Sequence, residues 1–247
     1  MGDAKKYTTP TQGLGDHAHT LARAGLGSIP FVGAVASELL GLIIAPPLAR
    51  RQTYLFESLG DGLRSLERDL GVVIEHLSSN DTFVDTALQA IQVALRTSQQ
   101  EKLDSLRYAI LNAALPNAPE ASMQQIFINL VDRFTVSHIR ILNFFHSPLE
   151  WFAKLGRPWP DGLDSPEHLS NADPKLVLRE AYPEMVLNTE FCDLLIHELT
   201  ESGLFIYRFV PVWSGTMLKR EDPKSSRTTA LGKQFIKFIT PPILETA

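Results

Sequence analysis

The sequence has almost no cysteine: Cys192 is the only one among 247 residues. A single cysteine cannot close an internal disulfide, and it cannot supply the paired thiolates of a structural zinc site. Its neighbours Phe191, Leu194 and Leu195 are apolar, so we interpret Cys192 as an inert core thiol. This cysteine usage is typical of a protein in a reducing cytoplasm.

The sequence also lacks the short motifs that indicate a particular chemistry. It contains no GxSxG, GxxxxGK(S/T), HExxH or GxGxxG pattern. His17 and His19 are two residues apart, but no acidic or thiol partner follows at a spacing suited to a metal. We therefore expect no catalytic, cofactor-binding or metal-ligating residues and no enzymatic activity. An enzyme whose motif a single sequence does not reveal is one alternative.

A surplus of positive charge is missing as well. The chain carries 23 Lys and Arg against 28 Asp and Glu, a net charge of −5, which argues against a general nucleic-acid coat. Hydrophobic residues make up 44% of the chain, enough to bury a core in one large domain or two smaller ones.

Long apolar runs are absent with one exception. Residues 26–45 carry one charge, Glu38, and are followed by Pro46-Pro47 and then Arg50-Arg51. A helix of about 20 apolar residues can cross a bilayer, so this run lies at the length threshold. Glu38 costs roughly 2.5–3.5 kcal/mol on the insertion scale, which favours a segment buried in the protein over one that contacts a membrane. Both interpretations remain open.

The large side chains of this run stand about four residues apart and can share one helical face. They are the expected contacts with a membrane or a protein partner: Phe31, Val35, Leu39, Leu40 and Ile43. In the resting state we expect them to be sheltered by the rest of the chain or by a second copy, because an exposed apolar patch drives association. The protein is then cytoplasmic, with membrane association as an alternative after activation. The run starts too deep in the chain for a cleaved signal peptide.

Hydrophobic periodicity predicts a mainly α fold: a flexible tail over residues 1–25 and a helical bundle over residues 26–150. Within the bundle we expect helices over residues 48–77, from Asn80-Asp81, over residues 100–115, and one long helix from Pro119-Glu120 to about residue 145. The long helix carries Leu130 and Phe134 on its core stripe.

Proline and glycine punctuate residues 151–173, which we interpret as a linker. Residues 174–247 then predict helices over 175–181 and 189–202, a strand over 204–212 and a final helix capped by Thr228. This order of elements indicates a small winged-helix-like α+β domain.

A winged helix raises the alternative of a nucleic-acid-binding regulator. The helix over residues 189–202 opposes this function, because it carries four carboxylates and no lysine or arginine. A basic stretch follows it, and its candidate phosphate contacts are Lys219, Arg220, Lys224 and Arg227. We predict no specific binding to duplex DNA, and a protein partner or a homo-oligomer instead.

The order of several blocks resembles the bacterial Abi-alpha family, which is linked to abortive infection against phage. The blocks are IPFVG at residues 29–33, QQEKLDSLRYAILNAAL at 99–115, IFINLVDRFTVSHIRIL at 126–142, ESGLF at 201–205 and TTALGKQFIKFI at 228–239. The resemblance spans roughly residues 26–240 and implies a role in host defence. It supplies no catalytic residues. We therefore expect a non-enzymatic interaction protein of phage defence that acts through its apolar segment.

Overall fold

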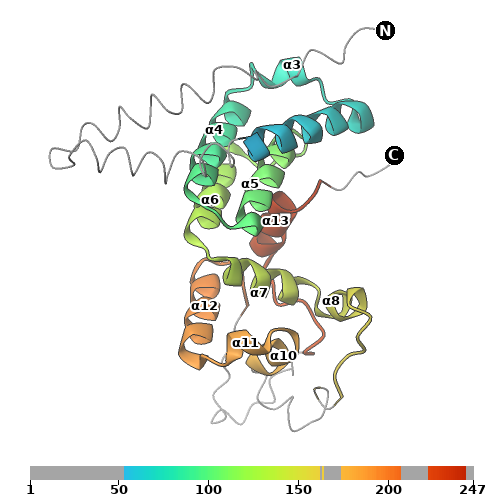
Figure 1. The fold of residues 1–247 in the computed structure, drawn as a ribbon, viewed down its shortest axis with the longest axis vertical. Coiled ribbons are helices and arrows are strands. Elements are labelled where there is room, and N and C mark those ends of the chain that lie inside the picture. Colours follow the sequence, from blue (N-terminus) through green and yellow to red (C-terminus); the bar gives the residue numbers. More distant parts are fainter. Residues whose placement is uncertain (1–52, 162, 164–173, 207–221, 243–247) are drawn as a thin grey trace, which may run out of the picture. The chain divides into compact units, whose positions relative to one another are not determined.

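The computed structural model describes residues 53–161, 163, 174–206 and 222–242, and these residues are mainly helical (Figure 1). Contacts divide the chain into two compact units. Unit 1 comprises Met1–Asp132 and Ile239–Ala247, and unit 2 comprises Arg133–Phe238. The mainly α prediction is confirmed. The predicted domains, a bundle over residues 26–150 and a second domain over residues 174–247, stay predictions. A division of the chain by contacts does not test whether either part folds alone.

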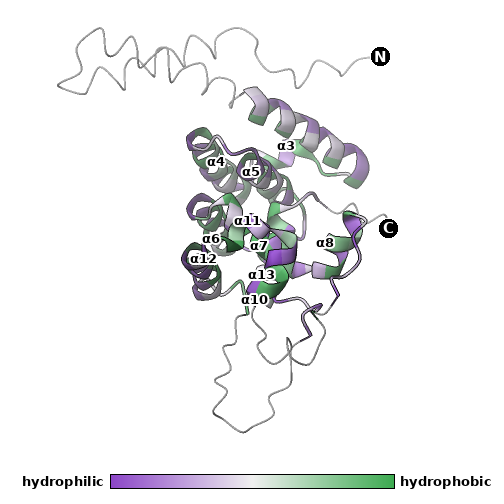
Figure 2. Ribbon diagram, turned by 60° about the horizontal axis from the view of Figure 1, so that its bottom comes forward, coloured by the Kyte–Doolittle hydropathy of each residue, from purple (hydrophilic) through white to green (hydrophobic). Residues whose placement is uncertain are grey.

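The described part of unit 1 starts with a helix over residues 53–70. The helices that follow it are α3 (Ile74–Leu77), α4 (Asp81–Arg96), α5 (Gln100–Ala113) and α6 (Ala121–Arg133), the last of which reaches the unit boundary. α4 has a hydrophilic and a hydrophobic face (Figure 2), whereas the last turn of α5, residues 109–113, is buried on all sides. The buried faces meet in a core that includes Leu106, Phe127, Ile128 and Val131, each fully buried.

The start of α4 is where the sequence predicts it, but the predicted helix over residues 48–77 is wrong in its end, because the structure ends that helix at residue 70 and starts α3 at Ile74. The Asn80 side chain accepts a hydrogen bond from the Phe83 N–H at 3.2 Å and caps α4. Gly71, with φ of 66°, ends the helix over residues 53–70, and its N–H bonds the Glu67 carbonyl oxygen at 3.1 Å. A glycine is favoured there because residues with a Cβ avoid the left-handed region.

Polar side chains join α4 and α6 both in the core and on the surface. The Thr86 hydroxyl donates to Gln124 Oε1 at 2.7 Å in the core, and Arg96 pairs with Asp132 at 2.8 Å on the surface. The Lys102 ammonium on α5 donates to the backbone carbonyl of Asp132 at 2.9 Å. Burial lowers the pKa of Lys102, an effect that the Asp132 carboxylate opposes. Lys102 thus satisfies a carbonyl at the end of α6, and we assign it a structural role.

The prediction of one long helix from Pro119-Glu120 to about residue 145 is wrong, because the structure has two helices there. Instead, α6 ends at Arg133 and α7 (Val136–His146) begins after Thr135, whose extended backbone places it at the N-cap. The N–H of Thr135 donates to His138 Nδ1 at 3.1 Å, so a histidine fills the role that Glu or Gln has in a capping box. The apolar residues recur at helical spacing on both sides of this break, because α6 and α7 each bury an apolar face. The periodicity alone therefore does not show the break.

Unit 2 continues with helices of mixed length. They are α8 (Pro148–Lys154), α10 (Pro174–Ala181), α11 (Pro183–Val186), α12 (Thr189–Glu201) and α13 (Ala230–Ile239), whose last residue reaches unit 1. The core of unit 2 is rich in aromatic side chains. Phe144 contacts Phe145, Trp151, Phe152 and Tyr182 with ring centroids 4.8–6.2 Å apart, mostly edge to face.

The predicted α+β winged-helix domain is wrong, because the described residues contain no strand. At the start of the predicted strand over residues 204–212, Phe205 forms one isolated antiparallel bridge with Thr228. Leu204 and Phe205 are buried by packing, and the Phe205 ring lies 5.3 Å from that of Phe145. An aromatic, apolar composition suits a buried segment as well as a strand, and α13 starts two residues after the bridge. Residues 207–212 lie outside the described part of the chain.

The start of α13 also differs by one residue from the sequence prediction. The hydroxyl of Thr229, not that of Thr228, accepts the Gly232 N–H at 2.9 Å. The Thr228 hydroxyl instead lies 3.2 Å from His146 Nδ1. Burial lowers the pKa of His146, Lys233 lowers it further, and Glu150 opposes them.

Two helical glycines give a matched pair of stability predictions. A Cβ on Gly232 would overlap the carbonyl oxygen of Leu204, whereas the nearest atom to a Cβ on Gly60 is an Arg64 nitrogen at 3.9 Å. We expect Gly232→Ala to destabilise the protein by about 1–3 kcal/mol, because a backbone atom must move. Gly60→Ala should stabilise it by up to about 1 kcal/mol, the difference in helix propensity. Urea melts measure both, and a Gly232→Ala variant as stable as wild type would contradict the close approach.

Among the described helices, none is long and apolar enough to cross a membrane. The apolar run over residues 26–45 lies outside the described residues.

Candidate functional site

A hollow of about 500 Å³ lies on unit 1, between the loops that join its helices. Its walls come from the residues after the helix over 53–70, from α3, from the first turn of α4, from the last turn of α5 and from the loop into α6. This volume is in the range of ligand and peptide side-chain pockets, which are about 300–1,000 Å³.

Two local features build these walls. Gly71 turns the chain out of its helix, so that Val72 and Val73 line the hollow. On the other side, Gln124 is 2% exposed, and its amide donates to the Pro119 carbonyl oxygen at 2.6 Å while its oxygen accepts from Thr86. Gln124 therefore fixes the loop before α6 against α4, and the hollow is held open by a satisfied buried amide.

Most residues that line the hollow are apolar, although polar atoms contribute almost half of its exposed surface. Its apolar residues are Val72, Val73, Leu77, Phe83, Ala113, Ala114, Leu115, Pro116, Ala118, Pro119 and Ala121, and its titratable ones are His76 and Glu120. Val73 is 48% exposed, and nearby in sequence Leu70 is 37% exposed. An apolar lining without a cluster of charged groups is suited to receiving apolar side chains. Within the described residues, no group of three or more His, Cys, Asp and Glu gathers to hold a metal.

The apolar residues predicted to contact a membrane or partner cannot be placed relative to this hollow. Phe31, Val35, Leu39, Leu40 and Ile43 all lie outside the described residues. The sequence did not predict the hollow either, since its lining comes from five separate segments. The predicted helix end at residue 115 places only one part of the wall, and the predicted helix over residues 48–77 runs through another part, at Gly71.

The predicted phosphate contacts divide into two pairs. Lys219 and Arg220 lie outside the described residues. Lys224 is half-buried, with its ammonium 5.6 Å from the centroid of the Trp159 ring. Arg227 is only 4% exposed; its guanidinium lies 6.0 Å from the centroid of the Phe145 ring, and its backbone N–H donates to the Phe145 carbonyl at 2.9 Å. This burial favours a packing role for Arg227 over a phosphate contact.

Two further residues with reactive side chains are core residues of unit 2. Cys192 is fully buried on α12, as expected. His138 is 3% exposed and stacks on Phe134 with ring centroids 4.8 Å apart, and its Nε2 lies 3.0 Å from Glu198 Oε2. Both of its ring nitrogens therefore have structural neighbours, on α7 and on α12.

Comparison with protein-family models, curated proteins and solved structures gave no match to this chain. The hollow, the exposed side chains and the sequence are therefore the observations that bear on the class of protein.

Proposed function

We propose that this chain is a non-enzymatic interaction protein of bacterial phage defence, of the abortive-infection type. Its apolar segment, residues 26–45, acts on a membrane or a protein partner after activation, and the hollow of unit 1 shelters that segment at rest. The observation that carries the proposal is the hollow itself: a partly apolar depression with room for a few side chains, on the unit whose first described helix follows the segment.

The connection between the segment and the hollow is long enough. Residues 46–52 can span roughly 25 Å when extended, at about 3.3–3.6 Å per residue. The helix over residues 53–70 is about 27 Å long at 1.5 Å per residue. The hollow begins directly after that helix, at Gly71. A segment that folds back along the helix therefore reaches the hollow.

The size of the hollow supports a reversible shelter. About 500 Å³ holds a few side chains, such as Leu39, Leu40 and Ile43, and not all twenty residues of the segment. Burying a Leu or Ile side chain contributes about 1.5–3 kcal/mol. A contact made by a few such side chains is weak enough for the binding of a partner or ligand to displace it. The resemblance to Abi-alpha supplies the defence context of the proposal.

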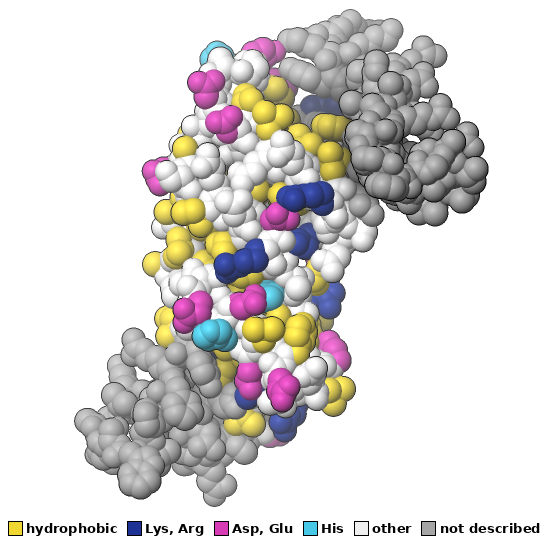
Figure 3. All heavy atoms as spheres, turned by 90° about the vertical axis from the view of Figure 1, so that its left-hand side faces the viewer, with side chains coloured by type: hydrophobic (Ala, Val, Ile, Leu, Met, Phe, Trp, Pro, Cys, Tyr) yellow, Lys and Arg dark blue, Asp and Glu magenta, His cyan; other side chains and the backbone are white. Residues whose placement is uncertain are grey.

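A nucleic-acid regulator receives no support from the described residues. Arg227 is buried, and on the face drawn in Figure 3 the lysines and arginines are interspersed with acidic side chains. A protein that neutralises phosphates needs a clustered basic surface.

The functional test uses bacteria that express the full chain and are challenged with phage. We expect a Leu39→Ser/Leu40→Ser/Ile43→Ser variant to lose protection, because serine removes the apolar side chains that the segment would insert or dock. The control is Leu88→Ser, an exposed residue of α4 that does not line the hollow. It should protect like wild type. Equal protection by wild type and the triple variant would remove the segment from the mechanism.

A dye-release assay then separates the two modes of action. If the segment acts on membranes, purified wild-type protein releases dye from anionic liposomes and the triple variant does not. If it acts on a protein partner, neither releases dye although the two differ in phage protection.

A further inference from the structure

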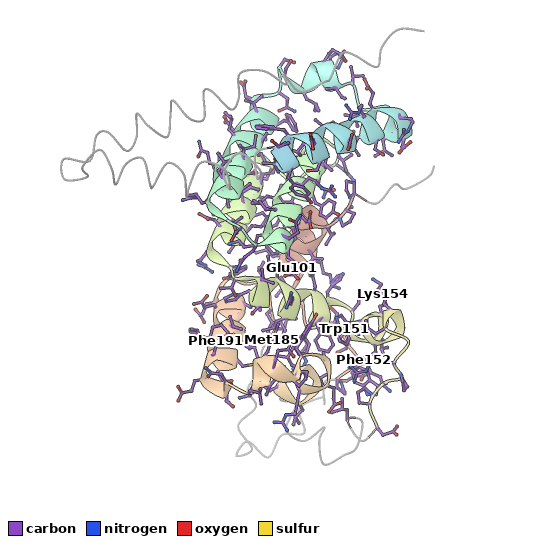
Figure 4. All side chains as sticks on the ribbon, in the orientation of Figure 1. Glu101, Trp151, Phe152, Lys154, Met185 and Phe191 are labelled. Carbon is purple, nitrogen blue, oxygen red and sulfur yellow. The ribbon has the colours of Figure 1, made fainter. Side chains whose placement is uncertain are left out.

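Helix α12 exposes large apolar side chains that its own packing does not need. Its buried face consists of Cys192, Leu195, Ile196 and Leu199, each at most 4% exposed. Yet Leu194 is 50% exposed, Phe191 is 41% exposed, and Leu187 in the turn before the helix is 87% exposed. We call Leu187, Phe191 and Leu194 the α12 patch. Figure 4 labels Phe191 on α12 and Met185 on the neighbouring α11.

Leu194 does not lie on the edge of the buried face of α12. At 3.6 residues per turn, it shares its face with Glu190, His197 and Glu201, all of which are exposed. The core residues lie on the other side of the helix. Half of the Leu194 side chain is open to solvent on this polar face. Exposed apolar groups that cluster and are rimmed by polar residues are typical of interaction sites.

The charged residues of α12 itself are all acidic, and the cations nearest to it are already engaged, Lys175 with Asp193 and Arg133 with the Ser202 hydroxyl. α12 carries Glu190, Asp193, Glu198 and Glu201 and no lysine or arginine. Asp193 is paired with Lys175 of α10 at 2.7 Å, and Glu198 lies against His138. Glu190 and Glu201 are exposed at the two ends of the helix, one on each side of Leu194 along the chain.

Apolar side chains beside carboxylates favour a binding partner that is both apolar and positively charged. An anionic membrane or a nucleic acid is repelled by the carboxylates, and a second copy would bring two acidic faces together. A helix with apolar residues at i, i+3, i+4 and i+7 and with lysine or arginine beside them satisfies both the leucines and the carboxylates. We propose that the α12 patch, with Glu190 and Glu201, binds a basic amphipathic helix of a partner protein.

This surface lies entirely on unit 2, and it shares no residue with the hollow of unit 1. It goes beyond the proposed function by giving the protein a second contact, through which a partner of defined chemistry is recognised.

Two matched synthetic peptides test the proposal on the full chain by fluorescence anisotropy. Both have the same leucine face, one flanked by lysines and the other by glutamates. We expect the lysine peptide to bind at least tenfold more tightly, with an affinity that falls as salt is raised. Leu194→Ser should weaken its binding by tenfold or more, and Glu190→Gln/Glu201→Gln should reduce the preference for lysine. The control is Leu155→Ser, a 56% exposed leucine after α8, which should change nothing.

Several outcomes would overturn the proposal. They are no binding of either peptide, equal binding of both, or binding that Leu194→Ser leaves unchanged. A wild-type dimer that Leu194→Ser converts to a monomer in analytical ultracentrifugation would make a second copy the occupant. Tighter binding of a peptide covering residues 26–51 of this chain, lost in Leu194→Ser, would make its own segment the occupant.

Discussion

Phe134→Ala lowers the free energy of unfolding by about 3–5 kcal/mol, the range for a large aromatic removed from a core. Phe134 belongs to unit 2, follows α6 in the chain and is fully buried. Its ring stacks on His138 at 4.8 Å and meets Phe235 of α13 edge to face at 6.2 Å. Alanine removes both aromatic contacts and leaves a cavity that two helices and a capping histidine cannot easily fill.

The matched control is Ile126→Ala, eight residues earlier. The sequence places Ile126 and Phe134 on one stripe, but Ile126 is 52% exposed. We expect its replacement to change stability by less than about 1 kcal/mol, as is usual for surface positions. Urea melts of both variants give the comparison. A change below 1 kcal/mol for Phe134→Ala would show that this face is open to solvent.

The sequence predicted helices well wherever a local signal ended them. Asn80 caps α4 as expected, and the predicted end of the helix over residues 189–202 is confirmed, with Gly203, φ of 72°, directly after its C-cap. Leu130 and Phe134 are buried as predicted. These features depend on a few neighbouring residues, so a single sequence contains them.

Errors arose where long-range packing decides the outcome. The break at Thr135 is stabilised by a histidine cap that ordinary capping rules do not include. The stretch from Leu204 predicts a strand by composition, yet Leu204 and Phe205 are buried by packing and α13 follows after one bridge. Short apolar runs do not reveal which of these two environments they occupy.

The candidate site was the least predictable part. The hollow depends on Gln124 joining the loop before α6 to Thr86 on α4, a contact across 38 positions of sequence. No local pattern records such a contact. The patch on α12 was also missed. Phe191 and Leu194 were interpreted as surroundings of Cys192, although at 100° per residue Leu194 lies among the acidic residues instead.

The second large effect concerns the shelter of the apolar segment, which is the central claim. If the segment occupies the hollow at rest, a residue in the segment lies close to a residue of the lining most of the time. Ala118 lines the hollow and is half-buried, so it accepts a cysteine without loss of a core side chain. Cys192 can remain, because its thiol is fully buried.

The most direct measurement is therefore cross-linking of Leu40→Cys/Ala118→Cys in the full chain with a short bismaleimide. We expect most of the protein to form an intramolecular cross-link, with a yield that does not depend on protein concentration. The control pair is Leu40→Cys/Gln92→Cys, since Gln92 is an exposed residue of α4 outside the hollow, and it should cross-link little. Equal yields for the two pairs, or cross-links only between separate chains, would contradict the claim that the hollow of unit 1 shelters the segment.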